Sequence, residues 1–135
     1  MEDLFKIEIK SVDGVLLEES VSFLRVNTSS GDMGIYSGHT FTISDVLEGV
    51  LEYQVNEDNS KLVYISDGVV VVKPDHVLVT VDYLKYAADF DKKDLSDTIK
   101  ESRKQYKEAS DYTDKMKFLN TLNISENKLK VASSI

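Results

Sequence analysis

The spacing of apolar residues changes once along this chain, and that change constrains the fold more than any other feature. Up to about Asp82 apolar and polar residues alternate, which predicts half-buried β-strands. After Asp89 apolar residues recur at spacings of four and seven, which predicts amphipathic helices. The predicted fold class is therefore α+β, with an N-terminal antiparallel β-sandwich in residues 1–84 and a C-terminal antiparallel two-helix hairpin in residues 85–135.

Turn signals divide the first part of the chain into short strands. Asp13-Gly14 and Asp67-Gly68 each lie between apolar runs, and each predicts a two-residue hairpin turn. Residues 69–72 are four valines, and such an unbroken apolar run predicts a strand that is buried on both faces. Residues 46–55 predict one further strand, in which Gly49 marks a bulge or a close approach. Short strands at this spacing are typical of a sandwich or a barrel.

Two helix starts are visible in the second part. Asp91 with Asp94, and Asp111 with Asp114, place carboxylates where free backbone N–H groups and the positive helix end would meet them. A break between two helices is expected near the second pair, and Ser125-Glu126 is a further candidate start. Two helices joined by a short loop normally lie antiparallel.

These helices carry many basic residues and few apolar ones. The simplest interpretation is a solvated helix face, and the functional one is a mobile basic segment that docks on an acidic partner. The basic residues of these helices include Lys92, Lys93, Lys100, Arg103, Lys104, Lys107, Lys115 and Lys117.

The composition argues against several functions. The net charge is -8, and a nucleic-acid binder needs clustered Lys and Arg, so no nucleic-acid partner is expected. The charge is uneven, because residues 1–84 hold 5 Lys/Arg and 15 Asp/Glu while residues 85–135 hold 11 and 9. There is no cysteine, no basic leader at Met1, and no run near the about 18 apolar residues of a membrane span. Membrane insertion is therefore not expected, and a membrane role would need another protein as anchor.

The densest local signal is the segment from Gly31 to His39, which has three glycines in eight residues. It is not a phosphate loop, because no Lys-Ser/Thr follows the last glycine and no helical pattern follows either. A structured bend between strands is the expected result. His39 and His76 are the only histidines, and no ligand pattern surrounds them. No metal, cofactor or catalytic residue is expected.

Three stretches carry a resemblance to a known family. Gly31-Asp32-Met33-Gly34-Ile35-Tyr36-Ser37-Gly38-His39 resembles the signature of the ATP synthase epsilon subunit. Residues 63–72 resemble the second stretch of that family, in which a turn precedes an apolar strand, and Asp89-Phe90-Asp91 resembles the opening of its first C-terminal helix. Order, spacing and length agree, so the resemblance covers essentially the whole chain.

The resemblance implies a non-catalytic central-stalk subunit of the F-type ATP synthase, peripheral on the cytoplasmic face of the bacterial cell membrane. Its sandwich would couple the gamma subunit to the membrane rotor ring of c subunits. Its helices would either fold on the sandwich or extend along gamma into the alpha/beta catalytic head and inhibit ATP hydrolysis. The resemblance does not indicate whether the coupled ion is H⁺ or Na⁺.

The resemblance also implies site residues. The candidate inhibitory contacts are Lys115 and Lys117, which would meet an acidic loop of the beta subunit. The expected rotor-ring and gamma interface consists of Gly31, Asp32, Met33, Gly34, Tyr36, Gly38 and His39.

One departure from the family bears on nucleotide binding. Some relatives bind ATP through an [IL]-D-x-x-R-A motif at the first helix, and the matching stretch here is residues 90–95. Asp94 stands where arginine is expected, and a carboxylate repels a polyanion. Weak or absent ATP binding is therefore expected.

Two other functions remain open on the sequence alone. One is a free-standing β-sandwich that binds a small ligand and carries a helical tail. The other is a small hydrolase that uses His39 with a nearby carboxylate.

Overall fold

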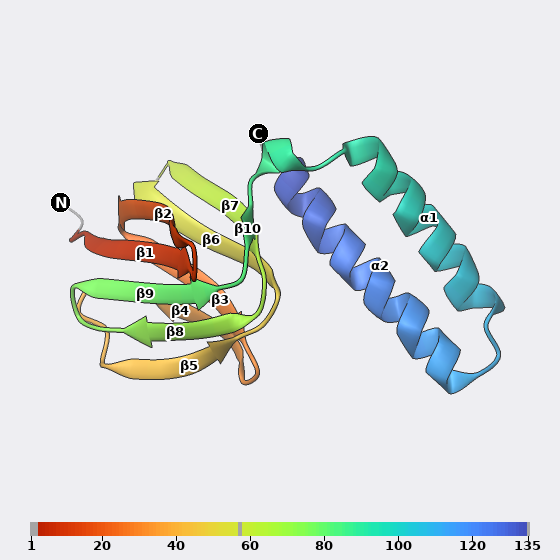
Figure 1. Cartoon of the computed structure of the whole chain (residues 1–135), viewed down its shortest axis with the longest axis horizontal. Coiled ribbons are helices and arrows are strands. Elements are labelled where there is room, and N and C mark those ends of the chain that lie inside the picture. Colours follow the sequence, from red (N-terminus) through yellow and green to blue (C-terminus); the bar gives the residue numbers. More distant parts are fainter. Residues whose placement is uncertain (1–2, 57, 135) are drawn as a thin grey trace. The chain divides into compact units, whose positions relative to one another are not determined.

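The computed structural model describes residues 3–56 and 58–134. The chain divides into two compact units, Met1–Lys85 and Tyr86–Ile135. Among the described residues, the first unit contains ten strands and the second contains the helices, so the α+β class is confirmed (Figure 1).

The first unit is a sandwich of two five-stranded sheets. All neighbouring strands are antiparallel except β1 and β9, which pair in parallel with Ile7 opposite Val77. The first sheet contains, in spatial order, β2 (Gly14–Val21), β1 (Phe5–Ser11), β9 (His76–Val81), β8 (Gly68–Val72) and β5 (Thr42–Val46). The second contains β10 (Leu84–Lys85), β7 (Asn59–Ile65), β6 (Gly49–Asn56), β3 (Phe23–Thr28) and β4 (Gly31–Ile35).

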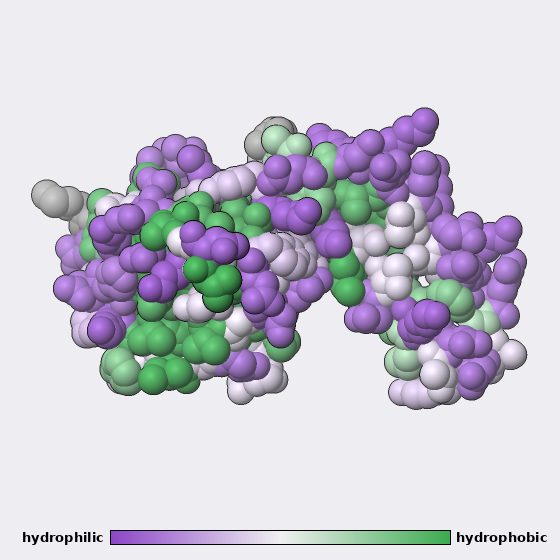
Figure 2. Space-filling view, in the orientation of Figure 1, coloured by the Kyte–Doolittle hydropathy of each residue, from purple (hydrophilic) through white to green (hydrophobic). Residues whose placement is uncertain are grey.

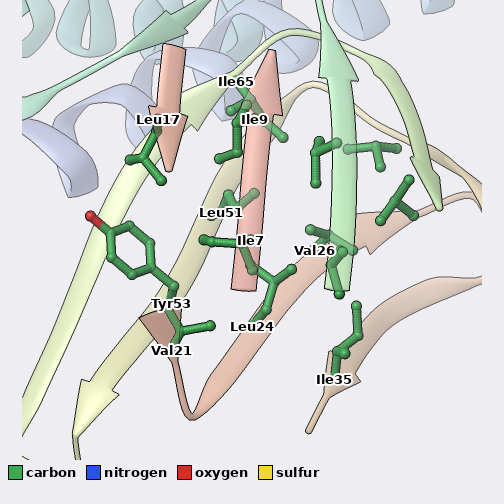
Figure 3. Close-up of a cluster of buried hydrophobic side chains, with 14 of the residues drawn as sticks. Ile7, Ile9, Leu17, Val21, Leu24, Val26, Ile35, Leu51, Tyr53 and Ile65 are labelled. Atoms are coloured by element: carbon green, nitrogen blue, oxygen red, sulfur yellow. The ribbon is translucent and has the colours of Figure 1, made fainter. Parts of the chain in front are cut away.

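The core lies between the two sheets and is formed by every second residue of the strands. Every second side chain of a strand points to the same face, so Ile7 and Ile9 of β1 and Leu24 and Val26 of β3 are all 0 % exposed. Figure 3 shows these side chains meeting between the layers, together with Leu51 of β6. Burying one such side chain contributes roughly 1.5–3 kcal/mol.

The first predicted hairpin is confirmed, with its turn one residue earlier than Asp13-Gly14. β1 and β2 pair antiparallel with Ser11 opposite Gly14, so Val12 and Asp13 form the turn. Gly14 has a φ of 130°, a conformation that favours glycine. Val12 at the tip is 98 % exposed.

The second predicted hairpin is wrong. β7 and β8 lie in different sheets, so Ser66 and Asp67 carry the chain from one layer to the other. Gly68 is required for space rather than for a turn, because a Cβ there would lie 1.9 Å from the carbonyl oxygen of Thr80. An Asp-Gly pair between apolar runs suits both arrangements, and local sequence does not distinguish them.

The strand of four valines is buried on one face only. Val70 and Val72 are 0 % exposed, whereas Val69 is 45 % exposed, because the second sheet covers one side of β8. The single strand expected at residues 46–55 is also interrupted. β5 ends at Val46 and β6 begins at Gly49 in the other sheet, and Gly49 has a φ of 157° at that crossing.

The second unit is a helical hairpin preceded by a short 3-10 helix, η1 (Ala87–Asp89). α1 (Lys92–Glu108) and α2 (Tyr112–Ala132) run antiparallel (Figure 1), and Arg103 of α1 contacts Glu126 of α2 at 3.2 Å. α2 continues through Ser125, so no third helix starts there. No helix among the described residues is long and apolar enough to cross a membrane.

The expected helix starts differ in their capping. The Asp91 carboxylate accepts hydrogen bonds from the backbone N–H groups of Lys93 and Asp94, at 2.9 and 3.2 Å. Asp111 occupies the same position before α2 but makes no side-chain capping bond. The capping bonds therefore fix the start of α1 more firmly than that of α2.

We predict that Gly68→Ala destabilises the sandwich by at least about 2 kcal/mol, because the added methyl group overlaps the backbone oxygen of Thr80 in the paired strand β9. Denaturant unfolding of the full chain measures the change. Val69→Ala is the matched control at the neighbouring, partly exposed position, where a smaller loss is expected. Equal stability of Gly68→Ala and the natural chain would contradict the packing described for β8 and β9.

Candidate functional site

The segment from Gly31 to His39 forms a strand and a turn rather than a bend. Residues 31–35 are β4, at the edge of the second sheet, and Tyr36 to His39 form the turn that follows. The backbone N–H of His39 donates to the carbonyl of Tyr36 at 3.2 Å, and that of Gly38 donates to Pro74 at 2.8 Å. Gly38 has a φ of 82°, so this turn needs its glycine.

The side chains of this segment face different ways. Asp32 is exposed, while Met33 is half-buried and packs against the core of the sandwich. Gly34 leaves room for the ring of Phe23, because a Cβ there would lie 3.2 Å from it. Tyr36 is 65 % exposed. Asp32 and Tyr36 are therefore the exposed side chains of the segment, and Met33 is directed partly into the core.

The expected interface residues also extend along the sandwich. Gly31 follows the β3–β4 turn, whereas His39 lies beyond the other end of β4, beside the turn that contains Pro74. A strand of five residues is about 17 Å long. A partner that contacts both Asp32 and His39 must therefore lie along the β4 edge.

His39 has no catalytic arrangement among the described residues. Its Nδ1 lies 2.8 Å from the carbonyl of Thr40, within its own turn. His76 pairs with Glu8 at 3.9 Å on the outer face of the first sheet. Among residues 3–56 and 58–134, no three His, Cys, Asp or Glu side chains are grouped so that they could hold a metal ion.

A surface that the sequence analysis missed lies on the outer face of the first sheet. Ile43 of β5 is opposite Val71 of β8, and Val71 is opposite Leu78 of β9, so the three side chains form one row. Ile43 is 63 % exposed and Val69 is 45 % exposed. Figure 2 shows the hydrophobic side chains that gather over these strands. The outer apolar patch consists of Phe41, Ile43, Val69, Val71 and Leu78.

The outer apolar patch ends at β9, where charged residues begin. On the same face β1 presents Lys6 and Glu8, Lys6 is paired with Glu18 of β2, and Glu8 lies opposite Leu78. An apolar centre with a charged margin is the usual organisation of a protein–protein interface. Contiguous exposed apolar residues on a small domain commonly mark such a surface.

The helical unit presents four of its basic residues together on α1. Lys100, Arg103, Lys104 and Lys107 of α1 recur at helical spacing and line a shallow hollow of about 330 Å³ together with Glu108. Of the two expected inhibitory residues, Lys117 is exposed on α2. The Lys115 ammonium instead lies 5.7 Å from the centre of the Tyr106 ring.

The carboxylate of Glu48 lies near the hydroxyl groups of Tyr64 and Tyr83, at the end of the sandwich where β10 lies. The Tyr64 hydroxyl donates to Glu48 at 2.5 Å. Burial, and then the hydrogen bond to Glu48, raises the pKa of Tyr64 above its ordinary range. Burial and Glu48 also raise the pKa of Tyr83 to about 12. The hydroxyl oxygen of Ser66 accepts from the backbone N–H groups of Asp82 and Tyr83, so this cluster fixes the strand that precedes the helical unit.

Comparison with known proteins identifies the class of this chain. Residues 4–86 match the family described as ATP synthase, Delta/Epsilon chain, beta-sandwich domain. The chain is 28 % identical over 109 residues to the ATP synthase epsilon chain of Bacillus subtilis (strain 168), which covers 81 % of this chain and 82 % of that one. The chain belongs to the ATP synthase delta/epsilon family. It is thus a subunit of the central stalk of ATP synthase rather than an enzyme in its own right.

Two solved structures share the fold. One is a chain of the Euglena gracilis mitochondrial ATP synthase OSCP/F1/c-ring structure, with a TM-score of 0.74, 21 % identity and coverage of 92 % of this chain and 78 % of that one. The other belongs to the central stalk/c-ring structure of the Tetrahymena thermophila mitochondrial ATP synthase, with a TM-score of 0.57, 12 % identity and 98 % coverage of both. At this level of identity the likeness concerns the fold.

We predict that the free energy of unfolding falls as the pH rises from about 10 to about 12. Tyrosines in the unfolded chain ionise near pH 10, while folded Tyr83 holds its proton until about pH 12, so the unfolded state is favoured progressively across that window. Denaturant unfolding at a series of pH values measures the loss, and Tyr83→Phe should reduce it.

Tyr112→Phe is the control, because Tyr112 is 74 % exposed on the helical unit. This substitution is expected to leave the loss of unfolding free energy at high pH unchanged. If the free energy of unfolding falls equally steeply with pH in Tyr83→Phe and in the natural chain, the role given to Tyr83 beside Glu48 is contradicted.

Proposed function

We propose that the sandwich couples the gamma subunit to the rotor ring of c subunits, and that the outer apolar patch is the surface that docks on gamma. The observation that carries this proposal is the row of Ile43, Val71 and Leu78, with Val69 beside it, on a face that the core does not use. Burying these side chains against a partner removes apolar surface from water, which is the main favourable term in association.

The β4 edge and the turn after it supply a second surface for the rotor ring. Asp32 and Tyr36 are exposed there, on the sheet opposite to the one that carries the outer apolar patch. Because the two surfaces belong to different sheets, the sandwich can hold two partners at once without competition between them. That is the property a coupling subunit needs. We propose that the complex lies on the cytoplasmic face of a bacterial cell membrane.

The helical unit supplies the regulatory part of the proposal. Its basic face on α1 and exposed Lys117 on α2 suit an acidic surface of the alpha/beta catalytic head. An extended arrangement of the helices would place these charges on the head and slow ATP hydrolysis. For such a switch to operate, the two arrangements can differ in free energy by only a few kcal/mol.

We predict that Ile43→Glu weakens binding of the full chain to purified gamma subunit at least about tenfold, because a carboxylate in the outer apolar patch would be buried against gamma without a partner. Titration calorimetry measures the affinity, and circular dichroism checks that the variant is folded. Val12→Glu is the matched control, since Val12 is apolar and 98 % exposed but lies at the β1–β2 turn. Equal affinity of both variants would exclude the outer apolar patch as the gamma surface.

We predict that removing residues from Asp89 onward leaves assembly of the ATP synthase intact and raises its ATP hydrolysis. The sandwich has its own core in the first unit, so the truncation removes the basic helices and leaves the docking surfaces. Lys117→Glu in the full chain should raise hydrolysis in part, while Lys61→Glu on β7 of the sandwich serves as the charge control. Unchanged hydrolysis after truncation would remove the inhibitory role and leave the coupling role standing.

A further inference from the structure

A hollow of about 250 Å³ opens on the outer side of the second sheet, near the start of β3. Drug-sized ligands usually occupy pockets of roughly 300–1,000 Å³, so this hollow suits a single side chain better than a whole small molecule. Its lining among the described residues consists of Asp3, Ser22, Phe23, Tyr36, Ser37 and Gln54.

Two aromatic rings form the apolar part of the hollow. The rings of Phe23 and Tyr36 lie 4.9 Å apart between their centres at an interplanar angle of 47°. Phe23 is only 7 % exposed, whereas Tyr36 is 65 % exposed, so Tyr36 presents ring surface to an incoming group. The fold keeps this arrangement in place because Gly34 leaves space for the Phe23 ring.

The chain already holds a cation against one of these two rings, that of Phe23. The guanidinium of Arg25 lies 5.4 Å from the centre of the Phe23 ring and is also paired with Glu52 at 3.1 Å. The faces of aromatic rings are negative and attract guanidinium and ammonium groups. The Phe23 ring therefore already contacts a guanidinium, whose charge is balanced by Glu52, and the exposed Tyr36 ring offers the same chemistry to a further cation.

The polar part of the hollow has the complementary charge. Asp3 is the one formally charged residue in the described lining, and it is exposed. The Ser22 hydroxyl donates its proton to the carbonyl of Gln54 at 3.2 Å, so its oxygen remains an acceptor. A carboxylate, hydroxyl oxygens and ring faces favour a cation, and no Lys or Arg of the described lining would favour an anion.

We propose that this hollow receives a lysine or arginine side chain of a partner protein. The carboxylate of Asp3 would pair with the charged head, while Tyr36 would lie against it and its aliphatic stem. The acidic balance of the sandwich, with 5 Lys/Arg against 15 Asp/Glu in residues 1–84, would draw a basic partner toward it. The inference rests on the surface proposed for the rotor ring, which includes Tyr36, and adds to it the chemistry of one contact.

The test titrates the isotope-labelled full chain with N-acetyl-arginine amide and follows its backbone amide signals by NMR. N-acetyl-citrulline amide is the matched control ligand, because it has the same shape without the charge. Arginine amide should bind at least about fivefold more tightly than citrulline amide, with the largest shifts at Ser22, Phe23 and Tyr36. Added salt should weaken the arginine complex alone.

Two variants test the residues of the hollow. Asp3→Asn and Tyr36→Leu should each weaken arginine amide about threefold or more, whereas Asp13→Asn, at the β1–β2 turn, should leave it unchanged. Equal affinity for the arginine and citrulline amides would overturn the proposal, as would shifts confined to other parts of the chain. Preference for putrescine over both amides would overturn the assignment to a protein side chain. None of these outcomes affects the gamma experiment, which tests another sheet.

Discussion

The packing of two sheets face to face through alternating aliphatic side chains is the constraint on which the rest of this structure depends. Ile7 and Ile9 from one layer and Leu24 and Val26 from the other are fully buried, so each strand has one committed face and one free face. The free faces then differ in chemistry. One carries the outer apolar patch, and the other carries the Phe23–Tyr36 pair with Arg25 and Glu52. The core thus leaves two separate surfaces available to partners.

The sequence predicted the layers well and the connections poorly. Alternation identified most strands, and the carboxylates at Asp91 and Asp111 marked both helix starts, because these signals are local. Whether Asp67-Gly68 forms a hairpin depends on the sheet to which β8 belongs, and the local sequence does not determine that sheet. The prediction that the valine strand is buried on both faces was wrong, because valine suits both a buried face and an exposed apolar surface. The outer apolar patch was therefore missed where its residues were interpreted as core.

The candidate interface shows the same division between local and distant information. The glycines of residues 31–39 meet local backbone requirements, since Gly31 and Gly38 have φ angles of 114° and 82°. Their side-chain neighbours could not be assigned to one surface from the sequence, because Met33 turns to the core while Asp32 and Tyr36 remain exposed. The Glu48–Tyr64 bond joins residues 16 positions apart and likewise had no sequence signal. Family membership and these free surfaces together support a subunit that works by holding neighbours.

Size-exclusion chromatography of the full chain mixed with purified gamma subunit tests the central claim most directly. The account predicts one complex of one copy of each chain, eluting ahead of both separate proteins. It also predicts that the complex persists at salt concentrations that screen exposed charges, because the proposed contact is mainly apolar. Elution of the chain as a free monomer beside folded gamma would contradict the coupling function.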